Sequence, residues 1–192
     1  MEKHFSLKIA HKKQIRWDSY FLNICDAVAK NSRCLSRKIG AILVKDHAII
    51  STGYNGPVRG ATHCDERNLD FFKKLEGKEW VINATYTRDI CPRRIFGYQS
   101  GKGLHLCQAG HAERNALIQA ARNGISVLGT TLYCNCPIPC KDCTIEIINS
   151  GVKEIVCFTG SDYDTYSRIL INETNIILRE LDKKELEKVN VI

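Results

Sequence analysis

The sequence predicts an α/β protein whose mixed or parallel sheet carries helices on both faces. From residue 111 onward, helix-like and strand-like segments alternate, as they do when helices connect the strands of such a sheet. The chain has 192 residues, which is enough for one well-buried domain, and 44% of them are apolar. Its four Pro and 13 Gly are too few for a disordered or fibrous protein.

The first predicted element is a helix over residues 17–31. Its apolar residues recur at helical spacing, and they are Tyr20, Phe21, Ile24 and Val28. Asp18 or Ser19 lies near the expected start, where a short polar side chain can cap a helix. Cys25 lies within this pattern, and we expect it to fill the core as a small apolar side chain.

A predicted hairpin follows the helix. Ile39–Val44 and Ala48–Tyr54 have the composition of strands, and residues 45–47 form the short turn between them. The next stretch, residues 57–110, is polar, irregular and long for a loop. We expect it to be an inserted segment within a single domain that spans residues 1–192.

Helices and strands alternate along the rest of the chain. The predicted helices cover residues 111–124, 140–149 and 163–170, and a charged helix ends the chain. The predicted strands cover residues 130–134, 154–159 and 176–178. Gly124 and Gly151 end the first two of these helices, because Gly readily takes the left-handed conformation of a helix C-terminus.

The composition argues against a membrane-spanning or secreted protein and favours an anionic partner. No apolar run approaches the roughly 18–20 residues that a membrane span needs, and the basic N-terminus lacks the apolar region of a secretory signal. We therefore expect a cytoplasmic protein, in which the ten cysteines bind metal or act in catalysis rather than form disulfides. Cys157, in a strand-like run, is another expected core residue. The net charge of +7 favours anionic partners, either nucleotides or nucleic acid.

Two short motifs predict a catalytic zinc site. Cys140 and Cys143 are three residues apart at a helix start, so they can chelate one ion where the helix terminus favours thiolates. His111 begins the other helix and supplies a third ligand, which leaves the open position that a catalytic zinc needs for water. Glu113 is rotated away from His111 along the helix, and we expect it beside that open position rather than on the metal. There it can move a proton to a ring nitrogen and to leaving ammonia.

The order of these motifs is more specific than either motif alone. An isolated His-Ala-Glu is usually one face of a helix, and a lone Cys-x-x-Cys is often redox-active or half of a structural zinc site. Together they form the H-x-E…P-C-x-x-C signature of zinc-dependent nucleobase deaminases. The sequence therefore predicts a zinc enzyme that removes an amino group from a base.

In wider segments the sequence resembles the deoxycytidylate (dCMP) deaminases, within the cytidine deaminase-like superfamily. The likeness covers residues 17–158 and rests on segments that occur in the family's order: WDSYFLNICDAVAKNSRC, RKIGAILVKD, ISTGYNG, HCDE, HAERNALIQAARNG, TLY, PCKDC and IINSGVKEIV. It implies a three-layer α/β/α sandwich around a five-stranded sheet, assembled as a homo-oligomer that is commonly a hexamer. It also implies hydrolysis of dCMP to dUMP and ammonia, which feeds thymidylate synthesis.

The resemblance further implies which residues meet the substrate. By analogy, Asn55 of GYNG contacts the sugar-phosphate, the backbone at Ala112 meets the pyrimidine, and Arg122 of AARNG lines the nucleotide site. The alternative is that Asn55 is a turn residue before Gly56 and that Arg122 is an exposed cation at a helix end. Many members are activated by dCTP and inhibited by dTTP, and Mg²⁺ would accompany such effectors.

The sequence differs from the usual pattern of the family in two places. The segment TLYCNCPIPCKDC has one more residue before its Pro-Cys than is usual, so the strand-to-helix turn must differ and Cys136 becomes a rival zinc ligand. The spacing of Cys140 and Cys143 fits one helical turn, and we therefore predict these two cysteines, rather than Cys136, as the zinc ligands. The middle segment is also longer and more basic than expected.

Several dCMP deaminases have a second, structural zinc, and this chain resembles them. Cys34 and Cys64 match the family positions that bind it. The remaining ligands would come from the middle segment, with Cys91 and Cys107 as first choices and His63 and His105 as rivals. Alternatively, the four cysteines are unrelated buried thiols.

The same segment contains a glycine-rich loop with cations. These polar residues are Arg93, Arg94, Ser100 and Lys102, in CPRRIFGYQSGKG. Such a loop either cradles a phosphate or is simply solvated.

Other functions share part of this pattern. A deaminase of tRNA or single-stranded nucleic acid would have the same zinc site, but it needs a basic surface with aromatic stacking platforms. Here aromatic residues make up only 8% of the chain and the basic ones are dispersed. Riboflavin-pathway deaminases share the core but lack the GYNG…HCDE pattern. A non-catalytic zinc domain would have little reason to keep Glu113, and whether dCTP is substrate or effector stays open.

Overall fold

The computed structural model describes residues 2–66, 91–95, 98–99, 102–161 and 164–189. Its main sheet contains β1 (Gly40–Lys45), β2 (Ala48–Tyr54), β5 (Thr131–Cys134), β6 (Glu154–Phe158) and β7 (Ile177–Leu181). The principal helices are α1 (Glu2–Ala29), α4 (Ala112–Arg122), α5 (Lys141–Asn149), α6 (Thr165–Asn172) and α7 (Lys183–Val189). The smaller elements are β3 (Gly56–Pro57), α3 (Pro92–Ile95), the 3-10 helix η1 (Leu104–Leu106) and β4 (Ala109–Gly110).

The sheet is mixed, as the sequence predicts. Its strand order is β2-β1-β5-β6-β7, in which β1 is antiparallel to both of its neighbours while β5, β6 and β7 are parallel. The predicted hairpin turn is present, and Asp46 and His47 at its tip have φ values of 49° and 62°. Left-handed residues at both central positions match the right-handed twist of the two strands.

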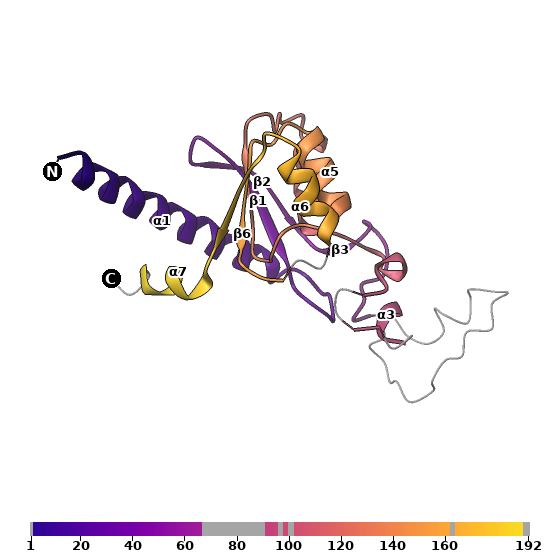
Figure 1. Cartoon of the computed structure of the whole chain (residues 1–192). Coiled ribbons are helices and arrows are strands. Elements are labelled where there is room, and N and C mark those ends of the chain that lie inside the picture. Colours follow the sequence, from indigo (N-terminus) through magenta and orange to yellow (C-terminus); the bar gives the residue numbers. More distant parts are fainter. Residues whose placement is uncertain (1, 67–90, 96–97, 100–101, 162–163, 190–192) are drawn as a thin grey trace.

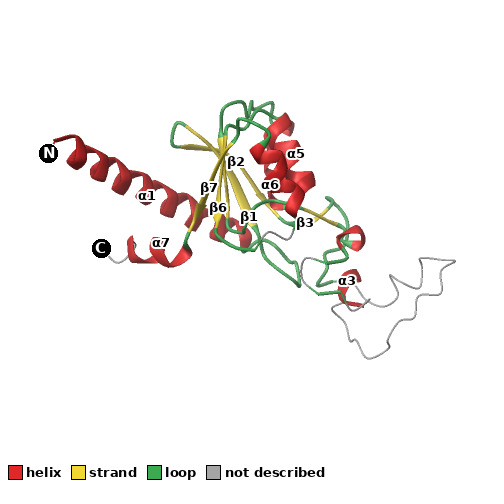
Figure 2. Ribbon diagram, in the orientation of Figure 1, coloured by secondary structure: helices red, strands yellow, loops and turns green. Residues whose placement is uncertain are grey.

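Helices cover both faces of this sheet and complete the predicted three-layer sandwich. In Figures 1 and 2, α1 and α7 lie on one side of the strands and α5 and α6 on the other. The alternation of side chains on β1 explains the two layers. Ala41 and Leu43 belong to the buried cluster that includes α4 and α5, whereas Ile42 and Val44 belong to the cluster that includes α1 and α7. Cys157 and Cys25 are fully buried, one in each cluster, as expected.

The start of the first helix differs from the prediction. α1 begins at Glu2 rather than near residue 17, and its N-terminal half extends beyond the sheet (Figure 1). The apolar period marks only the part of the helix that packs on the strands, so it could not reveal the earlier turns. Asp18 and Ser19 therefore lie inside the helix, and neither caps it.

Asp18 instead anchors α1 to the sheet. Its carboxylate is 1% exposed, and it accepts hydrogen bonds from Arg179 Nη1 at 2.6 Å and from the Tyr133 hydroxyl at 2.9 Å. Arg179 also pairs with Glu154 at 2.7 Å, so the network joins α1 to three strands. Glu180, the next residue on β7, accepts a hydrogen bond from Arg168 of α6. Helix α6 lies on the face of the sheet opposite α1 (Figure 1). One strand thus supplies a polar contact to each helical layer.

The inserted segment is described only in part, because residues 67–90, 96–97 and 100–101 lie outside the described residues. Its two ends are held together, since β3 and β4 pair through Gly56 with Gly110 and Pro57 with Ala109. Strand β4 ends two residues before α4 begins, so its pairing with β3 helps to fix the position of the helix start. None of the described helices combines the length and hydrophobicity needed to cross a bilayer.

We expect Arg179→Ala to lower the free energy of unfolding by about 3 kcal/mol, because it leaves the buried Asp18 carboxylate without its cation. Urea denaturation of the zinc-loaded protein measures the loss. Arg168→Ala is the control, since it removes a more exposed pair with Glu180 and should cost about 1 kcal/mol or less. Equal losses in the two variants would contradict the role assigned to the Asp18 network.

Candidate active site

The first turn of α4 is pressed directly against the hairpin. Gly53 of β2 has no room for a side chain, because a Cβ there would lie 2.3 Å from both the Ala112 oxygen and the Ala116 nitrogen. Asn115 donates through Nδ2 to the backbone oxygen of Tyr54 at 2.8 Å and to that of Gly110 at 3.3 Å. These contacts fix the helix start, and with it His111, which takes the extended backbone of an N-terminal cap.

The three predicted zinc ligands converge. His111 Nδ1 lies 3.3 Å from Cys140 Sγ and 3.3 Å from Cys143 Sγ, and all three ligand atoms lie within 4.8 Å of one another. A tetrahedral zinc with its usual bond lengths would separate nitrogen and sulfur ligands by about 3.5 Å. One imidazole and two thiolates are also a donor set that zinc prefers. The geometry and chemistry of these residues therefore fit a zinc ion with an open fourth position.

The ligand thiols are electrostatically unequal. A hydrogen bond from Cys143 lowers the pKa of Cys140 to about 4, whereas the same interaction raises the pKa of Cys143. The hydrogen bond with Cys140 raises the pKa of His111. A cation held between these groups would stabilise both thiolates.

Glu113 lies beside the ligand group without belonging to it. Its side chain is only 3% exposed, and burial raises its pKa above the usual value for a glutamate. Cys136 Sγ lies 3.9 Å from Glu113 Oε1, and these two residues form a second cluster with Cys134. Cys136, the rival ligand of the sequence prediction, is therefore directed to Glu113 rather than grouped with His111.

A cavity opens in front of these residues. It is lined by His111, Ala112 and Glu113 of the α4 start, Cys136 and Pro137 before α5, Asn55 after β2, Cys34, Ser36, Arg37 and Ile39 after α1, and Arg93, Leu104, Cys107 and Ala109 of the inserted segment. Ala112 and Asn55 are thus at the cavity wall, as the resemblance implies for residues that meet a substrate. Ser36 and Arg37 line the cavity too, although neither lies in a catalytic or metal-binding motif. Arg37 begins the resembling segment RKIGAILVKD, and Ser36 lies just before it.

Asn55 also has a structural task. Its Nδ2 donates to the Arg37 oxygen at 2.9 Å, and its Oδ1 accepts from the Ile39 nitrogen at 2.9 Å. Ser32 donates to the Asn55 backbone oxygen at 2.7 Å. The side chain therefore fixes the loop before β1 against the end of β2, and this loop forms one wall of the cavity.

Arg122 does not reach the cavity. It lies at the end of α4 opposite His111, ten residues after Ala112, which corresponds to about 15 Å along the helix axis. Its side chain is exposed and is absent from the cavity lining of the described residues. The interpretation as a cation at a helix end agrees with this position.

The four cysteines proposed for a second zinc do not form a group with ligand atoms within 4.8 Å of one another. Among the described residues, the groups of three or more potential ligands within 4.8 Å of one another are the His111 group and the Glu113 group, and neither contains Cys34, Cys64, Cys91 or Cys107. The segments of Cys34 and Cys64 do lie together, because Arg33 forms ion pairs with Asp65 at 2.7 Å and with Glu66 at 2.5 Å.

Comparisons with known proteins agree with this site. Residues 15–159 match the family described as the cytidine and deoxycytidylate deaminase zinc-binding region. A deoxycytidylate deaminase of Schizosaccharomyces pombe is 34% identical over 164 residues, which are 85% of this chain, and the chain spans 44% of that relative's length. A deoxycytidylate deaminase of Enterobacteria phage T4 is 32% identical over 90% of this chain and 93% of its own length.

A solved structure shares the fold. The dCMP deaminase of cyanophage S-TIM5, determined in complex with dCMP and dUMP, superimposes with a TM-score of 0.59. The match has 23% sequence identity and covers 84% of this chain and 94% of that chain. At this identity the comparison concerns the arrangement of the elements.

We expect Cys143→Ser to weaken zinc binding by more than about 100-fold, because removing a direct ligand should exceed the 10- to 100-fold effect of residues that only orient ligands. Competition with a chelator measures the affinity. Cys136→Ser is the matched control and should keep the affinity of the unchanged protein. A loss of zinc from the Cys136 variant alone would show that the ligand set is different.

Proposed function

The chain belongs to the family of cytidine and deoxycytidylate deaminases, and we propose that it hydrolyses dCMP to dUMP and ammonia, a reaction that would supply thymidylate synthesis. The observation that carries this proposal is the convergence of Cys140 and Cys143 on His111, whose Nδ1 lies 3.3 Å from each thiol, beside a buried carboxylate that is not part of the group. Relatives named deoxycytidylate deaminase support this substrate.

The residues of the site would have three separate roles, which are metal binding, proton transfer and contact with the base. Zinc held by His111, Cys140 and Cys143 would supply a Lewis acid that lowers the pKa of a water molecule. Glu113 would take one proton from the water molecule and deliver it to the ring nitrogen of cytosine. It would then transfer the second proton of that water to the leaving amine. Because burial raises its pKa, this carboxylate holds a proton more readily than an exposed one, which suits a group that both accepts and donates. The backbone of Ala112 would contact the pyrimidine.

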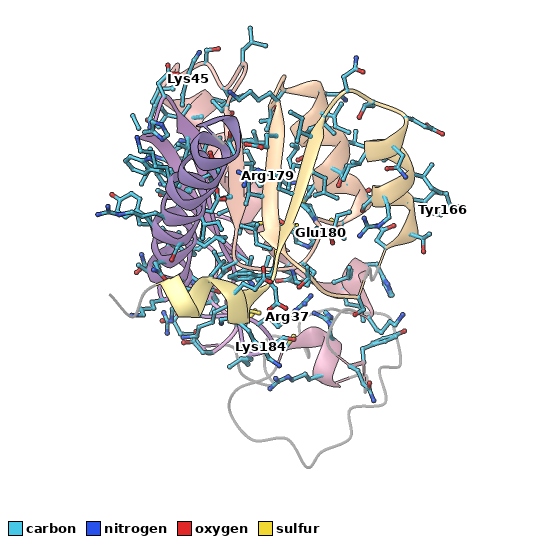
Figure 3. The ribbon with its side chains drawn as sticks, turned by 60° about the vertical axis from the view of Figure 1, so that its left-hand side comes forward. Arg37, Lys45, Tyr166, Arg179, Glu180 and Lys184 are labelled. Atoms are coloured by element: carbon cyan, nitrogen blue, oxygen red, sulfur yellow. The ribbon has the colours of Figure 1, made fainter. Side chains whose placement is uncertain are left out.

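Assembly into a homo-oligomer, with the hexamer as the expected size, is part of the proposal. Large apolar side chains remain exposed on the outer helices α4, α5 and α6, namely Ile118, Ile145, Tyr166 and Ile169. Figure 3 shows Tyr166 on the outer side of α6. Exposed large apolar side chains of this kind are available for contact with another subunit. Regulation by dCTP and dTTP, with Mg²⁺ bound to these nucleotides, and a cytoplasmic location remain predictions.

A second, structural zinc also remains a proposal. The ion pairs of Arg33 support it, since they hold the segment of Cys34 beside that of Cys64. His63 adds support, because its Nδ1 is buried and has no hydrogen-bond partner among the described residues. A metal ion could satisfy such a nitrogen.

Glu113→Gln should keep its zinc and lose about 10²- to 10⁴-fold in kcat, because the amide cannot take up and pass on the proton. Ammonia release from dCMP, dCTP, cytidine and an oligonucleotide, with zinc content measured in parallel, tests both the mechanism and the substrate. Glu173→Gln, at an exposed position beyond α6, should match the unchanged protein. A fully active Glu113 variant that retains zinc would refute the mechanism.

We expect two zinc ions per chain in protein purified without chelators, and one in Cys64→Ser, because only the proposed structural site loses a ligand. Elemental analysis normalised to protein concentration gives the count. The Cys64 variant should keep the His111 site, so its remaining zinc should be lost on further substitution of Cys143. A single zinc in the unchanged protein would contradict the second site.

A further inference from the structure

Arg93 is a buried cation in the wall of the candidate active site. Only 6% of its surface is exposed, although arginine is among the residues least often buried without a charged partner. Its Nε donates to the Lys102 oxygen at 2.5 Å and its Nη2 to the Gln99 oxygen at 2.8 Å. Both acceptors are neutral backbone carbonyls. Within the described part of the chain, no carboxylate forms a hydrogen bond or an ion pair with Arg93.

The position of Arg93 links this charge to the catalytic residues. It comes from α3, in the inserted segment, and it lines the same cavity as His111 and Glu113. Arg37, from the loop before β1, lines this cavity too. Glu113 is the only carboxylate among the described residues of the lining. Apart from the ligand group and Glu113, the charged side chains of the wall are therefore cationic.

We propose that Arg93 binds the phosphate of the nucleotide substrate and thereby selects nucleotides over nucleosides. A guanidinium has five N–H groups, of which the described residues accept two. The two carbonyls fix the plane of the guanidinium, and the other N–H groups can form the paired, charge-assisted hydrogen bonds that phosphate oxygens accept. A bound phosphate would also supply the anion that the buried cation lacks. This assignment rests on the proposed function, because it names the phosphate subsite of the same cavity.

The experiment separates phosphate binding from a structural role of Arg93 in its loop. Arg93→Gln, Arg93→Lys and Arg94→Gln are compared with the unchanged zinc-loaded protein, using dCMP, dCTP and deoxycytidine as substrates. Arg94 is the matched control, because it is the next residue of α3, carries the same charge and is exposed. Equilibrium binding of dUMP and of deoxyuridine to the same four proteins gives a readout that does not require turnover.

We expect Arg93→Gln to lower kcat/KM for dCMP by about 100-fold, the effect of losing charge-assisted hydrogen bonds, and to change that for deoxycytidine less than about threefold. Arg93→Lys should recover part of the loss, and Arg94→Gln should behave as the unchanged protein. Binding of dUMP should weaken by a similar factor, with no change for deoxyuridine.

Two results would overturn the proposal. Equal losses for dCMP and deoxycytidine would mean that Arg93 only supports its loop, and no loss for either would mean that the phosphate binds elsewhere. If the unchanged protein deaminates nothing but binds dUMP through Arg93, the subsite stands and the proposed reaction fails. If the Arg93 effect is seen with dCTP alone, the subsite again stands and the substrate is a triphosphate.

Discussion

The site depends on the close approach of two helix starts, those of α4 and α5. This approach brings the thiols of Cys140 and Cys143 each to 3.3 Å from the imidazole nitrogen of His111. Direct backbone packing of β2 on α4 at Gly53 fixes one helix, and the ion pair between Arg114 and Glu146 at 2.8 Å ties it to the other. The candidate zinc ligands thus lie at the starts of two packed helices, whereas loops form much of the cavity wall, an arrangement that favours precise metal geometry.

Much of the fold follows from local patterns in the sequence. The predicted strands Ile39–Val44 and Ala48–Tyr54 are present as β1 and β2, and Gly124 and Gly151 mark helix ends that the structure has. The failures have a common cause. Periodicity reports where an element packs, so it missed the first turns of α1, and it could not reveal that Asp18 binds Arg179, which is 161 residues away in the chain.

The residues of the candidate site also fall into those that local patterns predict and those that only the folded chain brings together. The grouping of His111, Cys140 and Cys143 beside Glu113 could be predicted, because zinc chemistry restricts the types and the spacing of ligands and each residue lies in a short motif. Arg37 and Arg93 could not be assigned to the cavity, since they come from separate loops that only the folded chain brings together. The role of Arg122 at the nucleotide stays a prediction. Arg122 shares a helix with His111 but lies at the other end of it, outside the described cavity lining.

The pairing of β3 with β4 has a consequence for the tolerance of the fold to length changes. It closes the inserted segment at its base, so the free-energy cost of a longer insertion rises only slowly with its length. Because this segment contributes Arg93, Leu104 and Cys107 to the cavity, a change in its length or sequence would reshape the cavity wall while the sheet and the helices that begin at His111 and Cys140 keep their places.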